Sequence, residues 1–293
     1  MKTARIELFG VCLAIETDHP EFLRAVWLRL PSPPKAGLRP SVARRYTLRP
    51  AGTGRSGWML LRGLRKPVFA ADLGAAADLL VDDAERLIAH RATDLVFVHA
   101  GAVVWRGRAI LLPGRSGAGK SELVAALLRA GARYLSDEFA VIDTHGLVHP
   151  YPRRLALRRE GGFERPAPEA FGARAARTPV PVAIVALLRY RGGAAYRVRA
   201  ISRGAAVLAL LANTLAARKR LDLARVACVA VAADSDCLRG TRGSAEEAAR
   251  RLMSEARLSA GSRGGGRSRQ AARPKRRGPS KGSRSARHEG AAG

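Results

Sequence analysis

The chain has 293 residues and a formal charge of +28 at pH 7, from 52 lysines and arginines against 24 aspartates and glutamates. This length can bury a sizeable core and predicts one large domain or two small ones. Every apolar run is shorter than the roughly 20 residues of a membrane-spanning helix, and the first residues lack a secretory signal pattern. We therefore expect a cytoplasmic protein with no membrane partner, whose three dispersed cysteines are reduced thiols.

The first 92 residues show strand and helix patterns in alternation. We expect strands within 4–16, a helix with Asp18 as its N-cap, a strand pair over 44–48 and 57–61, and a helix from residue 73 to about His90. Asp82 and Asp83 are adjacent on that last helix and so point in different directions, which favours a solvated face. We predict an accessory α+β region over 1–92 without a catalytic constellation.

The strongest signal is the glycine-rich stretch 114–121, which follows a strand pattern over 108–112 and opens a helix pattern that runs to about Arg129. Its spacing fits G-x-x-x-x-G-K-S/T, the phosphate-binding P-loop, in the strand–turn–helix context that this motif requires. The alternative is a glycine-rich turn that caps an ordinary helix. The residues expected to bind the nucleotide are Gly114, Arg115, Ser116, Gly117, Ala118, Gly119, Lys120 and Ser121.

The chemistry of a bound phosphate explains this spacing. Glycines let the backbone approach a phosphate closely, successive N–H groups form an anion nest, and the start of the helix adds its positive end. Lys120 would reach the β- and γ-phosphates, and the hydroxyl of Ser121 would ligate Mg²⁺. The stretch therefore predicts ATP and Mg²⁺ as ligands.

A long strand pattern over 95–105 turns through Arg106 and Gly107 into the strand that precedes the glycine-rich stretch. If Trp105 faces Arg108 across a two-residue hairpin turn, paired residue numbers sum to 213. His99 then lies opposite Gly114, beside the phosphate site. The alternative is a structural histidine in the core or at a strand end.

An acidic pair, Asp137 and Glu138, follows the next strand pattern, 132–136. A helix of about 11 residues leads away from the glycine-rich stretch by ~16 Å, and this strand returns by about the same distance. We therefore expect Asp137 and Glu138 at the carboxyl end of a neighbouring parallel strand, at the edge where ligands collect. The alternative is a polar turn before the strand over 139–143.

The remainder continues as an α/β pattern and ends in a basic tail. We expect strands over 182–190 and 196–201, a helix capped by Ser202, apolar patterns over 221–233, and a last helix near 244–256. Residues 257–293 hold eleven lysines and arginines against one glutamate and almost no large apolar side chain, so we predict disorder there. The domains expected are 1–92, 93–256 and the tail 257–293.

Several of these features occur in the order typical of one known family: a strand with His99, a hairpin, the stretch 114–121 followed by Glu122, a helix ending Arg129-Ala130-Gly131, and Ser136-Asp137-Glu138. This series resembles the C-terminal catalytic domain of the HPr serine kinase family. Because Glu138 stands where that family usually has a second aspartate, the chain looks more like the divergent HPr-kinase-related branch. The resemblance extends well over residues 95–160 and loosely to about 250.

The resemblance implies a P-loop kinase domain with a mixed sheet, as also seen in phosphoenolpyruvate carboxykinase. It implies ATP-dependent phosphorylation of a serine hydroxyl on a protein or peptide. Asp137 would be the acid/base toward that hydroxyl, with His99 nearby and Lys120 on the phosphates. Ser121, assisted by Glu122 or Glu138, would hold Mg²⁺. Hexamers occur among relatives, so the resemblance allows a homo-oligomer, although the sequence does not identify the oligomeric state.

Three other functions fit the same residues. One is a small-molecule kinase that uses the same site. Another is a nucleotide-binding protein that contacts nucleic acid through the basic tail 257–293, the only part for which we expect nucleic acid as a partner. The third is a catalytically silent ATP binder, which substitution of Asp137 would distinguish from a kinase.

Overall fold

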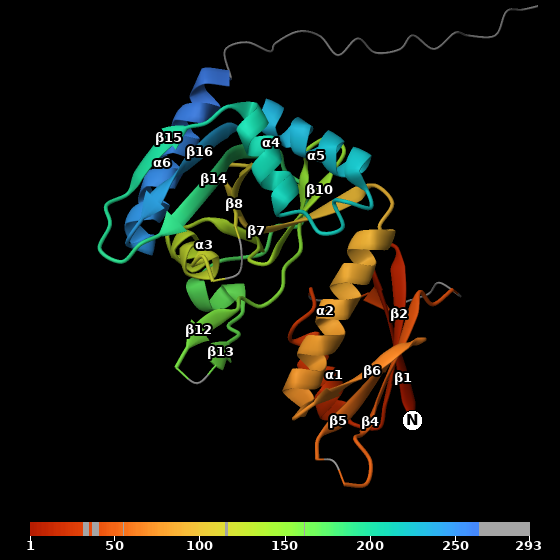
Figure 1. Ribbon diagram of the computed structural model, residues 1–293. Coiled ribbons are helices and arrows are strands. Elements are labelled where there is room, and N and C mark those ends of the chain that lie inside the picture. Colours follow the sequence, from red (N-terminus) through yellow and green to blue (C-terminus); the bar gives the residue numbers. More distant parts are fainter. Residues whose placement is uncertain (32–34, 37–40, 55, 115–116, 161, 264–293) are drawn as a thin grey trace, which may run out of the picture.

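The computed structural model describes residues 1–31, 35–36, 41–54, 56–114, 117–160 and 162–263. Arg115 and Ser116, both predicted to bind the nucleotide, and residues 264–293 of the predicted tail lie outside these ranges. The described residues form a mixed α/β structure with two open mixed sheets and a small β-ribbon (Figure 1). None of its helices is long and apolar enough to cross a membrane.

The N-terminal region consists of one sheet with two helices. Its elements are β1 (Lys2–Leu8), β2 (Val11–Thr17), α1 (Pro20–Trp27), β3 (Lys35–Ala36), β4 (Arg44–Pro50), β5 (Trp58–Arg62), β6 (Arg65–Ala70) and α2 (Leu73–Arg91). The strands lie in the order β3-β1-β2-β4-β5-β6, and the β2–β4 pair is parallel whereas the others are antiparallel. Both helices pack on the face that presents Ile6, Leu13, Tyr46 and Leu60.

Two predictions for this region were wrong. His19, and not Asp18, occupies the N-cap position of helix α1, and the Asp18 carboxylate pairs instead with the N-terminal amine of Met1 at 3.0 Å. Asp83 does not belong to a solvated face, since it is 5% exposed. Its carboxylate accepts hydrogen bonds from Arg44 at 2.5 Å and from Tyr46 at 2.9 Å, and these links tie α2 to the sheet.

The rest of the described chain forms the second sheet and its helices. Its elements are β7 (Leu95–Trp105), β8 (Arg108–Pro113), α3 (Lys120–Arg129), β9 (Arg133–Ser136), β10 (Phe139–Asp143), β11 (Val148–His149), β12 (Leu157–Arg159), β13 (Gly162–Glu164), the 3-10 turn η1 (Pro168–Phe171), β14 (Val182–Tyr190), β15 (Arg197–Ala200), α4 (Arg203–Ala212), α5 (Leu221–Ala233), β16 (Asp236–Arg242) and α6 (Ala245–Arg263). The sheet order is β11-β10-β7-β8-β14-β16-β15, with β9 also paired to β7.

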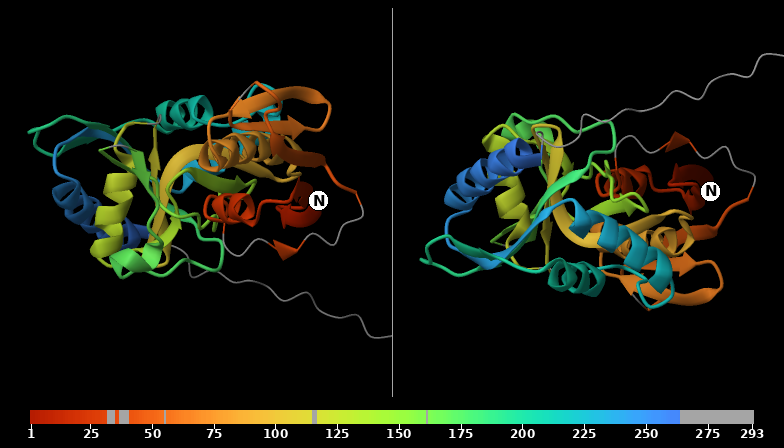
Figure 2. Two further views of the ribbon diagram at one scale, coloured as in Figure 1. Left: turned by 90° about the horizontal axis from the view of Figure 1, so that it is seen from below. Right: turned by 90° about the horizontal axis from the view of Figure 1, so that it is seen from above.

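Helices cover both faces of this second sheet. Alternation along β8 shows why, because Ile110 and Leu112 pack with α3 and α6 whereas Leu111 packs with α4 and α5. Figure 2 shows α3 and α6 on one side of the sheet and α4 and α5 on the other. The sheet is therefore a buried layer, as expected for strands linked by helical crossovers.

One of the two domain boundaries predicted from the sequence lies between elements, and the other lies inside a helix. Residues 92 and 93 lie in the short connection between α2 and β7, whereas residue 257 lies inside α6, which continues to Arg263. The core of the N-terminal region also includes Phe97, Phe139 and Tyr151 from the second region. The two regions thus share apolar packing beside the functional site.

The position of β9 differs from the expectation. It runs in the direction of β8, as predicted, but it is not the neighbour of β8, because β7 lies between them and β14 occupies the other edge of β8. Strands β9 and β10 follow each other along one edge of β7, with Ser136 opposite Ala102 and Phe139 opposite His99. Asp137 and Glu138 form the break between these two strands.

Candidate active site

Strand β7 places the two halves of the candidate site at the same level. On one edge, Ala100 pairs with Pro113, and the N–H of Gly114 donates to the carbonyl of His99 at 3.2 Å. Paired residue numbers therefore sum to 213, as predicted from the hairpin turn, and this prediction is confirmed. On the other edge, the N–H of Ala100 donates to the carbonyl of Glu138 at 3.1 Å. The acidic pair and the glycine-rich loop (residues 114–121) therefore lie on either side of one strand.

The described part of the glycine-rich loop has the backbone that a phosphate cradle needs. Gly117 and Gly119 have φ of +82° and +73°, which side chains disfavour. A Cβ on Gly119 would lie 2.6 Å from Nη2 of Arg242, so a larger residue would also displace this arginine. Helix α3 starts at Lys120, and its first N–H groups have no partner within the helix. The loop fits a phosphate group.

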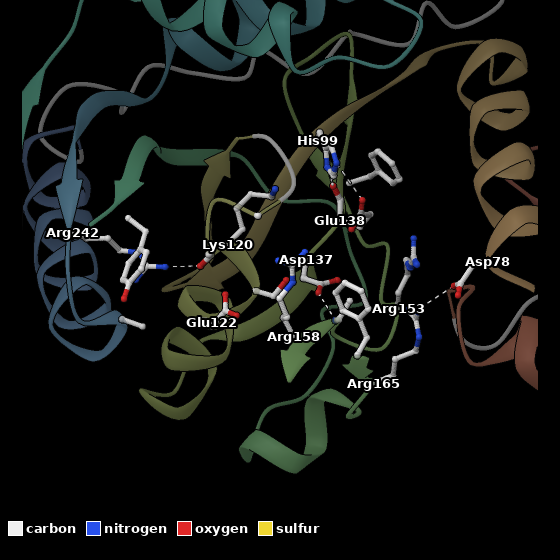
Figure 3. A pocket seen from close by; sticks show the side chains of 18 of the residues that line it. Asp78, His99, Lys120, Glu122, Asp137, Glu138, Arg153, Arg158, Arg165 and Arg242 are labelled. Atoms are coloured by element: carbon white, nitrogen blue, oxygen red, sulfur yellow. Dashed lines mark hydrogen bonds and ion pairs between the residues drawn. The ribbon is translucent and has the colours of Figure 1, made fainter. Parts of the chain in front are cut away.

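Lys120 lies over the loop and toward the acidic pair. Its Nζ donates to the carbonyl of Gly114 at 2.7 Å. Burial lowers the pKa of this amine, and the attraction of Glu138 and Asp137 opposes that shift. The structure thus brings together Lys120, Asp137 and Glu138, which the sequence had placed at the same edge (Figure 3).

Asp137 is a buried carboxylate on the pocket wall. It is 2% exposed, and it accepts hydrogen bonds from the Tyr134 hydroxyl at 3.2 Å and the N–H of Ala156 at 2.8 Å. Burial raises the pKa of Asp137, against the backbone hydrogen bond and the attraction of Arg153. Each carboxylate oxygen keeps a lone pair beyond these bonds. A carboxylate with a raised pKa is suited to accept a proton near neutral pH.

His99 and Glu138 form a second pair at the same place. The histidine Nδ1 lies 2.9 Å from the carbonyl oxygen of Glu138, and Nε2 lies 3.3 Å from its carboxylate. The ring also stacks on Phe139, with 5.2 Å between the ring centroids. His99 therefore lines the pocket with Glu138 beside it (Figure 3), and its ring is held between Glu138 and Phe139.

Arg242, at the end of β16, contacts the glycine-rich loop at Gly119. Its Nη2 donates to the carbonyl of Gly119 at 2.5 Å, and its guanidinium lies 5.2 Å from the centre of the Tyr190 ring. Burial lowers the pKa of Arg242, and the attraction of Glu122 opposes this. Glu122 thus lies toward Arg242. No short sequence motif marks Arg242 or Tyr190, and sequence reasoning missed both.

The far wall of the pocket comes from α2. Asp78, Asp82 and Glu85 recur at helical spacing along one face and line the pocket. Asp78 pairs with Arg165 at 2.8 Å, and Glu85 pairs with Arg153 at 2.5 Å. The N-terminal region, for which the sequence predicted no catalytic constellation, therefore supplies one wall. The spacing of the three acids was the available signal, but their partners lie far along the chain.

The pocket has a cavity volume of about 1190 Å³. Pockets for one small ligand are roughly 300–1,000 Å³, so this one has room for a nucleotide and part of a second substrate. Among the described residues, no cluster of three or more His, Cys, Asp or Glu side chains could hold a metal alone. Mg²⁺ is usually held by one or two carboxylates with substrate phosphates. The hydroxyl of Ser121 and the carboxylate of Glu138 fit that donor set, and Glu122 lies nearby in the same pocket.

Comparison with known proteins adds no further assignment. Neither a scan against models of protein families nor a search of curated proteins finds a match to this chain.

Proposed function

We propose that this protein is an ATP-dependent kinase that transfers the γ-phosphoryl group of ATP to a hydroxyl, as a serine on a protein or peptide would offer. One observation carries the proposal. The same pocket holds a glycine-rich loop with Lys120 at a helix start, and a buried carboxylate, Asp137, across strand β7 from that loop. The resemblance of the sequence to HPr serine kinases agrees with this reading.

Each residue has a role in the proposed reaction. The loop N–H groups and Lys120 bind the phosphates, and Arg242 keeps the loop in place through Gly119. Asp137 accepts the proton of the acceptor hydroxyl. At the same time the hydroxyl oxygen bonds to the γ-phosphorus, and the bond between that phosphorus and ADP breaks. Mg²⁺ would neutralise charge on the phosphates, held by Ser121 and Glu138.

Labelled ATP tests the proposal. The full chain is incubated with γ-³²P-ATP, Mg²⁺ and a lysate of the source cells, and the products are separated into macromolecules and small molecules. Label in protein or peptide that depends on Lys120 supports a serine kinase. Lys120-dependent label in the small-molecule fraction alone would indicate a small-molecule kinase, and the absence of both would contradict the proposal. Lys120→Ala is the control.

Removal of residues 264–293 separates a kinase from a nucleic-acid-binding protein. Because α6 continues to Arg263, the truncation is placed after that residue. A kinase should keep its transfer activity. A protein that acts by binding nucleic acid through the tail should instead lose most of its salt-sensitive affinity.

A further inference from the structure

Glu85 is a buried acid that links the N-terminal region to the pocket. It is 3% exposed and belongs to α2, yet it lines the same pocket as Lys120 and Asp137. Its Oε1 accepts hydrogen bonds from the Tyr151 hydroxyl at 2.8 Å and from Nη1 of Arg153 at 2.5 Å. Both donors lie more than sixty residues further along the chain, with separations of 66 and 68. These two hydrogen bonds therefore join the N-terminal region to the second region.

Arg153 has donors to spare inside the pocket. It is 9% exposed, and among the described residues Glu85 is the one hydrogen-bonding partner of its side chain. Its Nε is buried and has no hydrogen-bond partner within the described part of the chain. An anionic ligand bound here would supply the Arg153 guanidinium with acceptors that the described residues do not provide. Figure 3 shows Arg153 between Asp137 and the α2 side of the pocket.

Two of the other charges near Arg153, those of Asp137 and Glu138, belong to the proposed reaction. Attraction to Glu85, Glu138 and Asp137 raises the pKa of Arg153 against the effect of burial. Without Glu85, the guanidinium would be free to move toward the two remaining carboxylates. It would then neutralise the proposed base, Asp137. Glu85 therefore fixes the orientation of the Arg153 guanidinium.

We propose that Glu85 is a positioning residue for phosphoryl transfer, because it holds Arg153 so that its free N–H groups face the transferred phosphoryl group. This inference rests on the proposed kinase function. An arginine that contacts this group stabilises the charge that it carries in the transition state. The N-terminal region is then part of the catalytic unit.

Two substitutions on the same helix test the proposal. At pH 8, where the Glu85 carboxylate is charged, Glu85→Gln removes the charge that holds Arg153, and Asp83→Asn removes a similarly buried charge that faces the N-terminal sheet. Activity is measured per folded protein, with the folded fraction taken from thermal melts. We expect Glu85→Gln to lower kcat on the order of 100-fold with little change in KM for ATP. Asp83→Asn should lower Tm but leave kcat unchanged.

A double-mutant cycle shows whether Glu85 acts through Arg153. Arg153→Ala should lower kcat at least as much as Glu85→Gln, and adding Glu85→Gln to it should cause no further loss. An equal further loss in that background, or an unchanged kcat for Glu85→Gln alone, would overturn the proposal. If Glu85→Gln folds poorly, Glu85→Asp withdraws the carboxylate by one methylene and should lower kcat by a smaller factor, and an unchanged kcat there would equally overturn it.

Different results would contradict the proposed kinase function and the proposed role of Glu85. If Lys120→Ala leaves phosphoryl transfer intact, the kinase assignment itself is wrong. If Lys120→Ala abolishes transfer but Glu85→Gln does not change kcat, the kinase assignment stands and the role of Glu85 is wrong.

Discussion

The ring of His99 is held by Glu138 through both nitrogens, with Nδ1 at 2.9 Å from its carbonyl oxygen and Nε2 at 3.3 Å from its carboxylate. A carbonyl oxygen only accepts hydrogen bonds, so Nδ1 must carry a proton. The neighbouring acid thereby fixes the orientation of the ring. The pair lies beside Lys120 and Asp137 in the candidate site.

We predict that the neutral form of the His99 ring carries its proton on Nδ1. The hydrogen bond to the Glu138 carbonyl favours this position, although a free histidine has no such restraint. Side-chain ¹⁵N NMR of the labelled protein distinguishes the two nitrogens, with His99→Gln used for assignment. A neutral ring protonated at Nε2 would contradict the observed contact.

Gly101 sets how closely α3 packs on β7. A Cβ at this position would lie 2.7 Å from Cγ2 of Val124, so Gly101→Ala forces the helix away from the strand. Overpacking of this kind costs about 1–3 kcal/mol in the free energy of unfolding, and it should weaken ATP binding because α3 follows the glycine-rich loop. Urea denaturation and ATP titration measure the two effects.

Gly204 provides the control for that substitution. It lies in α4 with nothing within 4 Å of an added Cβ, and its φ is not positive. Gly204→Ala should keep or raise stability, by about 0.5–1 kcal/mol. Equal losses in the two variants would show that packing against Val124 is not the cause.

The stability of the protein should depend on pH through Glu85. Burial raises the pKa of Glu85 to about 7, against the attraction of Arg153 and the hydrogen bond from Tyr151, while Glu138 and Asp82 repel its charge. The folded state thus binds the proton more tightly than the unfolded chain, whose carboxyl has an ordinary pKa near 4.5. This contribution to stability is complete below about pH 4.5 and is lost as the pH rises through about 7.

Denaturation of wild type and Glu85→Gln across pH measures this contribution. The free energy of unfolding of the wild type minus that of Glu85→Gln should fall from pH 4.5 to 7 and then level off. Asp83 gives the opposite sign, because the hydrogen bonds of Arg44 and Tyr46 outweigh burial and lower its pKa. Its contribution should be lost only as the pH falls below its ordinary value of 3.8. A flat difference for Glu85 would contradict its raised pKa.

Tyr190 should contact the nucleotide base. Tyr190 is 54% exposed and lines the pocket, and its ring packs on Arg242, which holds Gly119. Loss of an aromatic contact worth about 1.4 kcal/mol changes affinity tenfold, so Tyr190→Ala should raise the Kd for ATP by about that factor. Tyr190→Phe keeps the ring and should leave Kd unchanged. Equal affinity of all three proteins would exclude a base contact at Tyr190.

The register of the site was predictable where the chain folds back on itself over a short distance. Arg106 and Gly107 form the turn that fixes the β7–β8 hairpin, and this alone places His99 opposite Gly114. Glycine spacing likewise predicted where α3 begins. In these places, local geometry leaves few alternatives.

Long-range pairing was harder to predict. The position of β9 depends on which edge of β7 is free, and neighbouring residues carry no signal for this. The role of α2 depends on Arg153 and Arg165, whose separations from their acids are 68 and 87 residues. An acidic face with distant partners has the same local pattern as a solvated one, so Glu85 could not be distinguished from a surface acid.

In the proposed reaction, Asp137 acts on the acceptor hydroxyl while the glycine-rich loop holds ATP. The most direct test compares Asp137→Asn with wild type in two measurements on the same preparation, ATP binding by calorimetry and transfer of γ-³²P to the acceptor. We predict an unchanged Kd for ATP and a loss of transfer of about 100-fold or more. Undiminished transfer by Asp137→Asn would contradict the claim.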